Sequence, residues 1–576
     1  MSFHPDAMPF HHALTLGKRR AIAWGLSATL PYRLVQSSYP FIAVIDSNPG
    51  AWGCKVAGIP VIAPSDLASF DPADTVVVVM ADFGLYGEAI VQAVAAQGPF
   101  PVITPLEFDT LPDLLPLVTA PTSQAWPADG SGAGEAAGWR DVPAAFGRVL
   151  AEVVRPRTAD APLPAVPGHA CLLIGSLSPG GAERQIAYLG AGLRRRGWRV
   201  TVLSFYPPMA GAENYVRLLE AAGAELLVLP SARAIWGTLT RADWQRWTPA
   251  LRLGCPLASF MQHAVVAVQS VLEERKADVL FTYLDANNLV GGMAGLLAGT
   301  PRIVMSGRNL NPTHFPGMVD FCSDGAALPQ LFRRMLNCPG VTMTNNSRAG
   351  AQSYASWLGV EEAAIPVVAN AVDVATLKSV DRKAGERWRR HLGLGPDQPV
   401  VVGAMRLAPE KAPLRFLEVI RRLRDRLPDV HAILLGDGPL RAAVEDARDA
   451  LGLDGTVTLM GARADVYELM LAGNLLLQTS TVEGMPNVVL EAQSLGRAVV
   501  ATAAGGTVEC LTAPLRPYVQ AGQPDRLVDG LVSACTELLS DRRRAAALGA
   551  EAAALIARDF SIERMTEATL AVAGLA

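Results

Sequence analysis

Two carboxylates, Glu483 and Glu491, lie eight positions apart near the C-terminal end of the chain, on either side of a turn that contains Gly484 and Pro486. The apolar run before this turn predicts a buried strand, and the residues after it predict a helix that Asn487 caps. Open α/β sheets bind ligands where a strand ends and a helix begins, and the free N–H groups at the helix start suit a phosphate. Carboxylates beside a phosphate are better suited to accept hydrogen bonds from hydroxyl groups. This stretch therefore predicts recognition of a sugar or a ribose.

Two cations, Arg406 and Lys411, lie five positions apart on a loop between a predicted strand, 399–402, and a predicted helix, 414–427. The planar fork of arginine and the movable point charge of lysine are complementary ways to hold phosphate oxygens. The pair predicts a clamp for a diphosphate.

Other loops follow the strands of the same C-terminal region. Gly436 begins a glycine turn after one strand, Arg463 follows the next strand, and the pair at 505–506 follows a later one. Loops at the same ends of successive parallel strands converge on one edge of the sheet. We expect these residues to join Arg406, Lys411 and the two acids there.

A similar edge is predicted further upstream. Gly180 and Gly181 separate a strand, 170–174, from a helix, and Asp285 and Arg308 each follow a later strand. A glycine pair lets a ligand approach the backbone closely, although a tight turn alone also accounts for it. Arg308 could neutralise a phosphate and Asp285 could accept from an acceptor hydroxyl; simple loop capping is the alternative for both.

The composition limits the classes of function. The chain has 576 residues and a net charge of −4, which argues against a nucleic-acid partner. Its seven cysteines form no close pair and no metal-ligand spacing, so we expect a cytoplasmic setting and no metal. No apolar run is long enough to span a bilayer. The basic run 194–196 is interpreted as a solvated helix end, or as peripheral contact with the inner face of a membrane.

The alternation of strands and helices predicts an α/β chain with Rossmann-like domains. Its divisions are a first unit at 1–118, a linker rich in Pro, Gly and Ala at 119–168, which includes a short helix, a second unit at 169–372 and a third at 373–576. In the first unit, Asp46 lies where a dinucleotide fold places its ribose-binding acid, but no glycine fingerprint follows Gly25. A structural or regulatory role is favoured for that unit.

Residues 169–576 resemble the retaining nucleotide-sugar glycosyltransferases of family 4, which have the GT-B fold. The first unit, over about residues 19–108, resembles the small Rossmann-like domains attached to cell-surface glycan enzymes. The motifs that carry the main resemblance are Gly-Gly-Ala-Glu at 180–183, Asn-Ala-Val-Asp at 370–373, Arg406 with Lys411, Glu-Gly-Met-Pro-Asn at 483–487, Glu491, and Gly505-Gly506 with Glu509.

This resemblance implies two facing domains, an acceptor domain at 169–372 and a nucleotide-sugar donor domain at 373–560, with a last helix in 561–576 that crosses back to the acceptor domain. It implies that Arg406 and Lys411 hold the diphosphate, that Glu483 contacts the sugar and that Glu491 contacts the ribose. The remaining donor-binding residues are Gly484, Met485, Pro486, Asn487, Arg463, whose backbone would meet the base, and Gly436. The acceptor-side residues are Gly180, Gly181, Asp285 and Arg308.

The implied reaction is metal-independent and needs no cofactor beyond the nucleotide-diphosphate sugar, which is a co-substrate. The implied acceptor is a glycan or a polyprenyl-linked glycan of a bacterial surface polysaccharide or lipopolysaccharide. The chain departs from the family at Ala371, Ala412 and Ala498, and Ala412 narrows the phosphate approach. Two alternatives remain open, a sugar-nucleotide hydrolase or epimerase and a non-catalytic nucleotide-sugar or glycan sensor.

Overall fold

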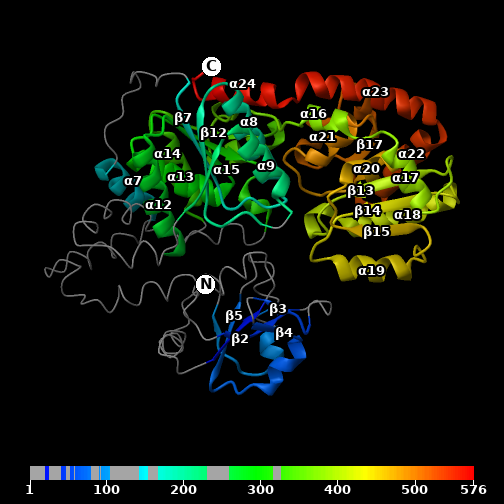
Figure 1. The fold of residues 1–576 in the computed structure, drawn as a ribbon, viewed down its shortest axis with the longest axis horizontal. Helices are drawn as coiled ribbons and strands as arrows, with labels where there is room; N and C mark the ends of the chain where they lie inside the picture. Colours follow the sequence, from blue (N-terminus) through cyan, green and yellow to red (C-terminus); the bar gives the residue numbers. More distant parts are fainter. Residues whose placement is uncertain are drawn as a thin grey trace.

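The computed structural model describes residues 20–24, 41–46, 52–56, 59–79, 90, 93–103, 142–153, 167–209, 211–229, 259–315 and 326–576. Within these residues the chain forms three sheets, each flanked by helices or turns of its own segment of sequence (Figure 1). The predicted α/β fold class with Rossmann-like sheets is confirmed.

The first sheet is small and mostly parallel, with the strand order β3-β4-β2-β1-β5-β6. Its core includes the buried side chains of Ile22, Trp24 and Val77. Asp46 follows β2 as predicted, but Gly25 lies outside the described residues. The elements are β1 (Arg20–Trp24), β2 (Phe41–Ile45), β3 (Lys55–Val56), β4 (Ile59–Ile62), η2 (Pro64–Ser69), β5 (Thr75–Val79) and β6 (Val102–Ile103).

The second sheet is parallel and has the order β12-β11-β10-β7-β8-β9. Its strands are β7 (His169–Ile174), β8 (Arg199–Ser204), β9 (Glu225–Val228), β10 (Val279–Tyr283), β11 (Arg302–Gly307) and β12 (Val341–Asn345). The helices around it are α8 (Gly181–Arg195), α9 (Glu213–Ala222), α12 (Ser259–Arg275), α13 (Asp285–Leu297), η3 (Pro312–His314), α14 (Leu328–Leu336), α15 (Arg348–Leu358) and η4 (Glu362–Ala364).

The third sheet repeats this plan with the parallel order β15-β14-β13-β16-β17-β18. Its strands are β13 (Val400–Ala404), β14 (His431–Leu435), β15 (Val457–Gly461), β16 (Leu475–Gln478), β17 (Ala498–Thr502) and β18 (Val519–Gln520). The helices are α16 (Val374–Ser379), α17 (Ala384–His391), η5 (Pro409–Lys411), α18 (Pro413–Arg426), α19 (Arg441–Ala450), α20 (Val466–Ala472), α21 (Asn487–Ser494), η6 (Gly505–Cys510), η7 (Ala513–Tyr518), α22 (Pro524–Ser540), α23 (Arg542–Asp559) and α24 (Ile562–Val572).

The sequences of the central strands explain why these sheets are parallel. β10 and β17 are buried along their whole length, as expected when helices cover both faces of a parallel sheet. The strand order of the third sheet reverses between β13 and β16, which are neighbours although three strands apart in number. Such a switch point opens a crevice at the carboxyl ends of the strands. The loop after β13 carries Arg406 and Lys411, and the loop after β16 carries Glu483.

Helix α7 (Val142–Val153) lies in the segment predicted as a linker. Phe146, Val149 and Leu150 are buried in the same core as the second sheet, and α7 contacts α14. The helix is therefore part of the second domain, and the expectation of a free tether fails for these residues.

The last helix of the chain crosses from the third domain to the second. α24 packs on α8, and Ile562 and Met565 are buried in the core that α8 shares with the second sheet (Figure 1). The crossing itself is tied to the link between the domains, because the N–H of Val372 donates to the carbonyl oxygen of Phe560 at 2.8 Å. Val372 also forms an isolated parallel bridge with Ser561.

The basic run at the end of α8 faces this last helix. Arg195 pairs with Glu563 at 3.1 Å, and Arg196 pairs with Glu567 at 2.6 Å. Both arginines remain partly exposed, so the pairs leave the run at the surface while partly neutralising it. No helix among the described residues is long and apolar enough to cross a membrane.

Ala412 occupies an unusual backbone conformation between η5 and α18. Its φ and ψ are 47° and 56°, which is the left-handed region, and it is the residue that precedes the first turn of α18. A residue with a Cβ is disfavoured there by about 1–2 kcal/mol, whereas glycine is tolerated. This explains in physical terms why glycine suits the position better than the alanine in this chain.

We predict that Ala412→Gly stabilises the protein by about 0.5–1 kcal/mol. Relief of the left-handed strain exceeds the extra freedom that glycine gives the unfolded chain, which is about 0.5–1 kcal/mol. Urea unfolding followed by circular dichroism measures the change. Ala443→Gly, at an exposed position inside α19, is the matched control and should instead lower stability by about 1 kcal/mol. A loss of stability in both variants contradicts the prediction.

Candidate functional site

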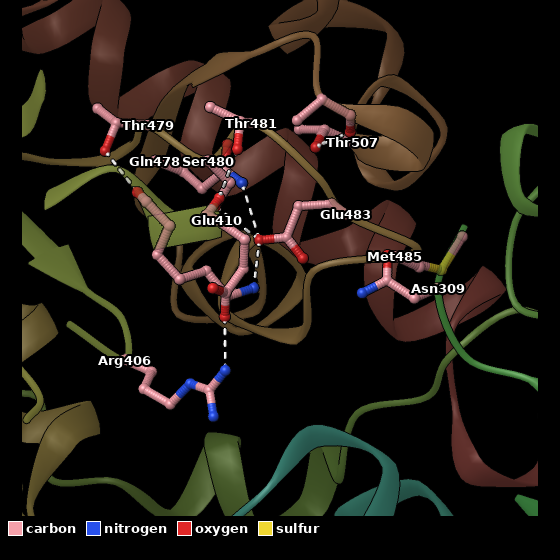
Figure 2. A network of polar contacts seen from close by, with 12 residues as sticks. Asn309, Arg406, Glu410, Gln478, Thr479, Ser480, Thr481, Glu483, Met485 and Thr507 are labelled. Carbon is pink, nitrogen blue, oxygen red and sulfur yellow. Dashed lines mark hydrogen bonds and ion pairs between the residues drawn. The ribbon is translucent and has the colours of Figure 1, made fainter. Parts of the chain in front are cut away.

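The carboxylate of Glu483 is the centre of a polar network at the switch point of the third sheet. The ammonium group of Lys411 lies 2.6 Å from its Oε1 atom. Ser480 Oγ donates to the same oxygen at 2.7 Å, and Gln478 Nε2 donates to it at 3.2 Å. Glu483 is only 6% exposed, so these donors offset the cost of burying its charge. All three of these side chains contact Oε1 of Glu483, and Figure 2 shows its second carboxylate oxygen, Oε2, pointing away from them.

Arg406 lies beside this network and is held differently. Its Nη2 atom is 2.6 Å from Oε1 of Glu410, while its side chain is 67% exposed (Figure 2). Burial would raise the pKa of Glu410, but hydrogen bonds from Arg406 and the backbone outweigh burial and lower it. The structure therefore brings both predicted cations to one edge, each with a carboxylate partner. Glu410 was not among the predicted site residues, although it precedes Lys411 directly.

Glycines allow the loops at this edge to approach one another. A Cβ atom on Gly505, whose φ is +48°, would collide with the carbonyl oxygen of Glu483. A Cβ on Gly484 would lie 2.6 Å from the carbonyl oxygen of Arg308, which belongs to the second domain. A Cβ on Gly436, whose φ is +119°, would collide with the carbonyl oxygen of Met405. Gly436 thus supports the loop that carries Arg406, and Gly484 lets the two domains meet closely.

The segment 485–487 faces the other domain. The Nδ2 atom of Asn370 donates to the carbonyl oxygen of Met485 at 2.8 Å and to Oδ1 of Asn487 at 2.7 Å. Gln185 Nε2, from α8, donates to Asn487 Oδ1 at 3.1 Å and to the carbonyl oxygen of Ala371 at 2.8 Å. These contacts fix the loop after β16 to both the interdomain link and the second domain.

The prediction that Asn487 caps α21 is wrong. The capping residue is Pro486, and Asn487 is the first helical residue. The side-chain oxygen of Asn487 is occupied by the two donors across the interface, and its Nδ2 donates to the carbonyl oxygen of Gly181 at 3.3 Å. An amide side chain satisfied by distant partners has no need to turn back on its own helix.

Glu491 has partners from both domains. The guanidinium of Arg184, in α8, pairs with its Oε1 atom, and the hydroxyl of Tyr467 donates to the same atom at 3.1 Å. Arg184 also donates through Nε to the hydroxyl of Tyr215 at 3.1 Å. Glu491 is 5% exposed and lies in α21, as its position after the turn predicted. Nothing in the local sequence signalled Arg184 as its partner, because the two residues lie on different domains.

Gly180 and Gly181 lie at the start of α8, where two different neighbours need the space. A Cβ on Gly181 would come within 3.0 Å of Asn487 Nδ2. A Cβ on Gly180 would collide with the carboxylate of Glu183, which accepts a hydrogen bond from Ser178 at 3.1 Å. Burial raises the pKa of Glu183. The glycine pair therefore permits close packing at the interface.

Glu509 does not point into the site. Its carboxylate accepts hydrogen bonds from the backbone N–H groups of Arg348 at 2.6 Å and Ala349 at 2.8 Å, at the start of α15 in the second domain. A carboxylate at a helix N-terminus satisfies donors that lack partners within the helix. Glu509 is thus an anchor between the two large domains.

Asp285 is a buried carboxyl group at the carboxyl end of β10. The hydroxyl of Tyr354 donates to its Oδ1 atom at 2.6 Å. Burial raises the pKa of Asp285 to about 6, although the hydrogen bond from Tyr354 opposes the shift. Leu284, just before it, has φ of 76° and ψ of 149°, a conformation that is sparsely populated by residues with a side chain. Strained backbone of this kind often lies at functional sites.

Arg308 lies in the same part of the second domain. Its guanidinium stacks over the ring of Tyr283 at 4.4 Å and donates to Oδ1 of Asn370. Its buried Nε atom has no hydrogen-bond partner among the described residues. Burial lowers the pKa of Arg308, which nevertheless stays charged at neutral pH because arginine cannot be deprotonated in proteins. Through Asn370, the predicted acceptor-side cation contacts the residue that also holds Met485 and Asn487.

Arg463 lies further from this cluster, in the loop after β15. It pairs with Asp465 through two contacts of 2.7 and 2.9 Å and stacks over the ring of Trp388 at 4.8 Å. The hydrogen bonds that the Arg463 guanidinium donates to the carboxylate of Asp465 raise the pKa of Arg463. Its side chain is therefore committed locally, and the prediction that concerns it is for its backbone.

The edge can bind anions and hydroxyl groups at once. Lys411 and Arg406 supply positive charge, the start of α21 supplies N–H groups, and Glu483 and Glu491 supply acceptors. Among the described residues no group of three histidine, cysteine, aspartate or glutamate side chains is placed to hold a metal ion. Besides Glu410, sequence reasoning missed Arg184 and Gln185, although both directly follow the motif at 180–183.

The chain is similar to several known proteins. Residues 398–541 match the family described as Glycosyl transferases group 1. The Vi polysaccharide biosynthesis protein VipC/TviE of Salmonella typhi is 28% identical over 356 residues, covering 60% of this chain and 60% of that protein. The D-inositol 3-phosphate glycosyltransferase of Mycobacterium bovis is 32% identical over 242 residues, covering 39% of this chain and 47% of that enzyme. The chain thus spans about half to three-fifths of the length of these relatives.

Solved structures support the fold. The Anabaena protein HepE in complex with UDP and glucose matches 71% of this chain and 99% of its own, with a TM-score of 0.57 and 22% identity. A glycosyltransferase from Rickettsia africae matches 71% of this chain and 98% of its own, with a TM-score of 0.56 and 14% identity. The two large domains therefore have the GT-B fold that the resemblance implied.

We predict that Asp285 makes stability depend on pH. Its pKa rises from 3.8 when unfolded to about 6 when folded, so folding favours the protonated form. This contribution is fully present below about pH 4 and is lost as the pH rises through 6. The loss is about 3 kcal/mol, because each pKa unit corresponds to about 1.4 kcal/mol. Asp285→Asn, which keeps an acceptor for Tyr354, should therefore gain stability relative to the wild type between pH 4 and 7.

Thermal unfolding of both proteins across this pH range measures the difference. Tyr354→Phe removes a hydrogen bond that lowers the pKa of Asp285, so it should move the inflection to higher pH. Parallel pH profiles for the wild type and Asp285→Asn would show that the group does not titrate as described.

Proposed function

We propose that this chain is a retaining glycosyltransferase that moves a sugar from a nucleoside diphosphate sugar to a glycan or polyprenyl-linked acceptor in bacterial surface polysaccharide synthesis. The observation that carries the proposal is the ion pair of Lys411 with Glu483 at the switch point of the third sheet. It joins a phosphate-binding cation and a hydroxyl-binding acid on the edge where α/β sheets bind ligands. The group 1 glycosyltransferase domain at 398–541 includes both residues.

The cations stabilise the charge that develops when the bond from the sugar to the diphosphate breaks. Lys411 exchanges part of its contact with Glu483 for a phosphate oxygen, and the exposed guanidinium of Arg406 moves from Glu410 to the same diphosphate. The N–H groups at the start of α21 add fixed dipoles. Preorganised donors of this kind act most strongly on the transition state, where the charge is greatest.

The two acids recognise the donor. Ser480, Gln478 and Lys411 hold Oε1 of Glu483, so Oε2 accepts from a sugar hydroxyl without reorganisation of the loop. Glu491 accepts from the ribose, and in the absence of ribose its Oε1 atom is paired with Arg184. With no protein nucleophile assigned, the acceptor attacks on the face that the nucleotide leaves, and the leaving phosphate takes the acceptor proton.

The second domain supplies the acceptor side. Asp285 and Arg308 follow neighbouring parallel strands, and Arg308 contacts the interdomain Asn370. Support also comes from the names of relatives, since the Salmonella typhi protein is described as a polysaccharide biosynthesis protein and HepE is described in complex with UDP and glucose. The basic run 194–196 is the segment proposed to contact a membrane, and two of its arginines, Arg195 and Arg196, also pair with acidic residues of α24.

We predict that Lys411→Ala and Arg406→Ala each lower kcat by about a hundredfold or more. Loss of one preorganised donor costs about 3–4 kcal/mol of transition-state stabilisation. Release of nucleoside diphosphate from a panel of nucleotide sugars, with the acceptor present, measures turnover. Lys378→Ala, which removes an exposed lysine in α16, is the control and should leave turnover unchanged.

The same assay separates the alternatives. Full turnover without an acceptor would identify a hydrolase or epimerase. Donor binding without turnover would identify a sensor. Near-normal turnover in both Lys411→Ala and Arg406→Ala would overturn the clamp itself.

We also predict that turnover persists in the presence of excess EDTA, because side-chain cations carry the charge that a metal ion would otherwise neutralise. Turnover lost in EDTA and restored by added Mg²⁺ or Mn²⁺ would contradict metal independence. The EDTA-treated Lys411→Ala variant, tested with and without Mg²⁺, shows whether a metal replaces the missing ammonium group.

A further inference from the structure

A cavity lies at the opposite edge of the third sheet from the site described above. Its volume is about 460 Å³, and its lining includes Arg382, Asn474, Arg497, Arg542 and four alanines of α23. Asn474 directly precedes β16 and Arg497 directly precedes β17. Glu483 and Gly505, by contrast, follow the same two strands. Because the strands are parallel, the cavity belongs to their amino ends and is separate from the proposed donor site.

Three arginines meet in this cavity, and backbone carbonyl groups hold each of them in place. Arg382 donates to the carbonyl oxygen of Leu495 at 2.6 Å, and Arg497 donates to that of Gly473 at 3.1 Å. Arg542 donates to the carbonyl oxygen of Asp397 and lies 3.2 Å from its carboxylate. A guanidinium group carries five N–H donors, so these contacts leave several donors on each residue unspent.

Arg497 has a buried donor without a partner. Its Nε atom is inaccessible to solvent and forms no hydrogen bond with any described residue. Buried polar groups in folded proteins nearly always have a partner, so an exception calls for an explanation. Of the other nitrogens of Arg497, Nη1 donates a hydrogen bond to the carbonyl oxygen of Gly473. The bond to Gly473 therefore accounts for one donor of Arg497 and leaves Nε without a partner among the described residues.

The charges around the cavity are unbalanced. None of the residues that line it is acidic. Asp397, the partner of Arg542, has a side chain that is 98% exposed, so solvent screens its charge. Burial lowers the pKa of Arg497, and the nearby charges of Arg382 and Arg389 lower it further. Like charges held this close repel one another, and a bound anion would relieve that repulsion.

The remaining wall is apolar and made of small side chains. Ala545, Ala546, Ala550 and Ala553 come from one helix, α23, which runs along the cavity. Small side chains leave room between this helix and the arginines. The volume lies within the range of small-molecule sites, and it is larger than a single phosphate ion requires.

We propose that this cavity is a second anion site, which binds the phosphate or diphosphate group of a small phosphorylated molecule. The planar fork of arginine matches phosphate oxygens in pairs, and three such groups from three segments of the chain surround one space. The alanine wall takes the uncharged part of the ligand. The site goes beyond the proposed transfer reaction and stands whether or not that reaction is correct.

Calorimetric titration of the full chain with inorganic pyrophosphate tests the proposal. The wild type should bind two equivalents, one at each edge of the third sheet. Lys411→Ala should weaken one of them, and Arg382→Gln with Arg542→Gln should weaken the other at least tenfold. Arg421→Gln, on α18 and paired with Glu418, is the matched control and should change neither. Substitution of Arg382, which is exposed, and of Arg542, the first residue of α23, disturbs the fold less than substitution of Arg497, whose Nε is buried.

A second variant keeps all the arginines. Ala550→Phe places a large side chain at an exposed position of the cavity wall and should remove the second equivalent while circular dichroism stays unchanged. A single equivalent that disappears in Lys411→Ala would overturn the proposal, as would two equivalents with equal affinity in the arginine pair variant and the wild type.

The phosphate could belong to a solute or to a lipid headgroup, and cosedimentation with phosphatidic acid vesicles separates the two. Equal sedimentation of the wild type and the arginine pair variant, with pyrophosphate binding lost in the variant, assigns the site to a solute. Loss of both assigns it to a headgroup. Sedimentation that depends on the arginines, without any second pyrophosphate equivalent in the wild type, contradicts a site for a small molecule.

Discussion

The side chain of Asn370 is the contact on which the arrangement of the two large domains depends. Its amide nitrogen holds the carbonyl oxygen of Met485 and the side chain of Asn487, and its oxygen accepts from Arg308. One short amide thus joins the link between the domains, the loop after β16 and the acceptor-side cation. Each of these groups is buried or partly buried, so an unpaired member would cost about 1–3 kcal/mol. The geometry of the site is consequently a property of both domains together.

The charges at the site are paired in advance. Lys411 lies against Glu483, Arg406 against Glu410 and Arg184 against Glu491. Isolated charges in a partly buried crevice would be costly, and pairing keeps the cations close to where an anion binds. The phosphates of a ligand can pair with the cations, while hydroxyl groups of the same ligand donate hydrogen bonds to the acids. A simple anion would draw the cations away and leave Glu483 with Ser480 and Gln478, and Glu491 with Tyr467, as neutral donors only.

The local pattern of the sequence was enough to predict the α/β class, the loops after the strands and the position of Lys411, Glu483 and Glu491. Continuous apolar strands and polar turns are local signals, and they specify which loops share an edge. The role of Asn487 could not be predicted, because its partners, Asn370 and Gln185, are more than a hundred residues away. The same limit applies to Arg184 and to Glu509. Helix α7 was predicted as a helix, but only the packing of Phe146 shows to which domain it belongs.

The two chain crossings between the large domains lie side by side, because Val372 on the first crossing is hydrogen-bonded to Phe560 on the second. One hydrogen bond and one isolated parallel bridge join the two crossings there. A separation of the two large domains at this point would therefore break the hydrogen bond of Val372, whereas a bend of both crossings together would keep it.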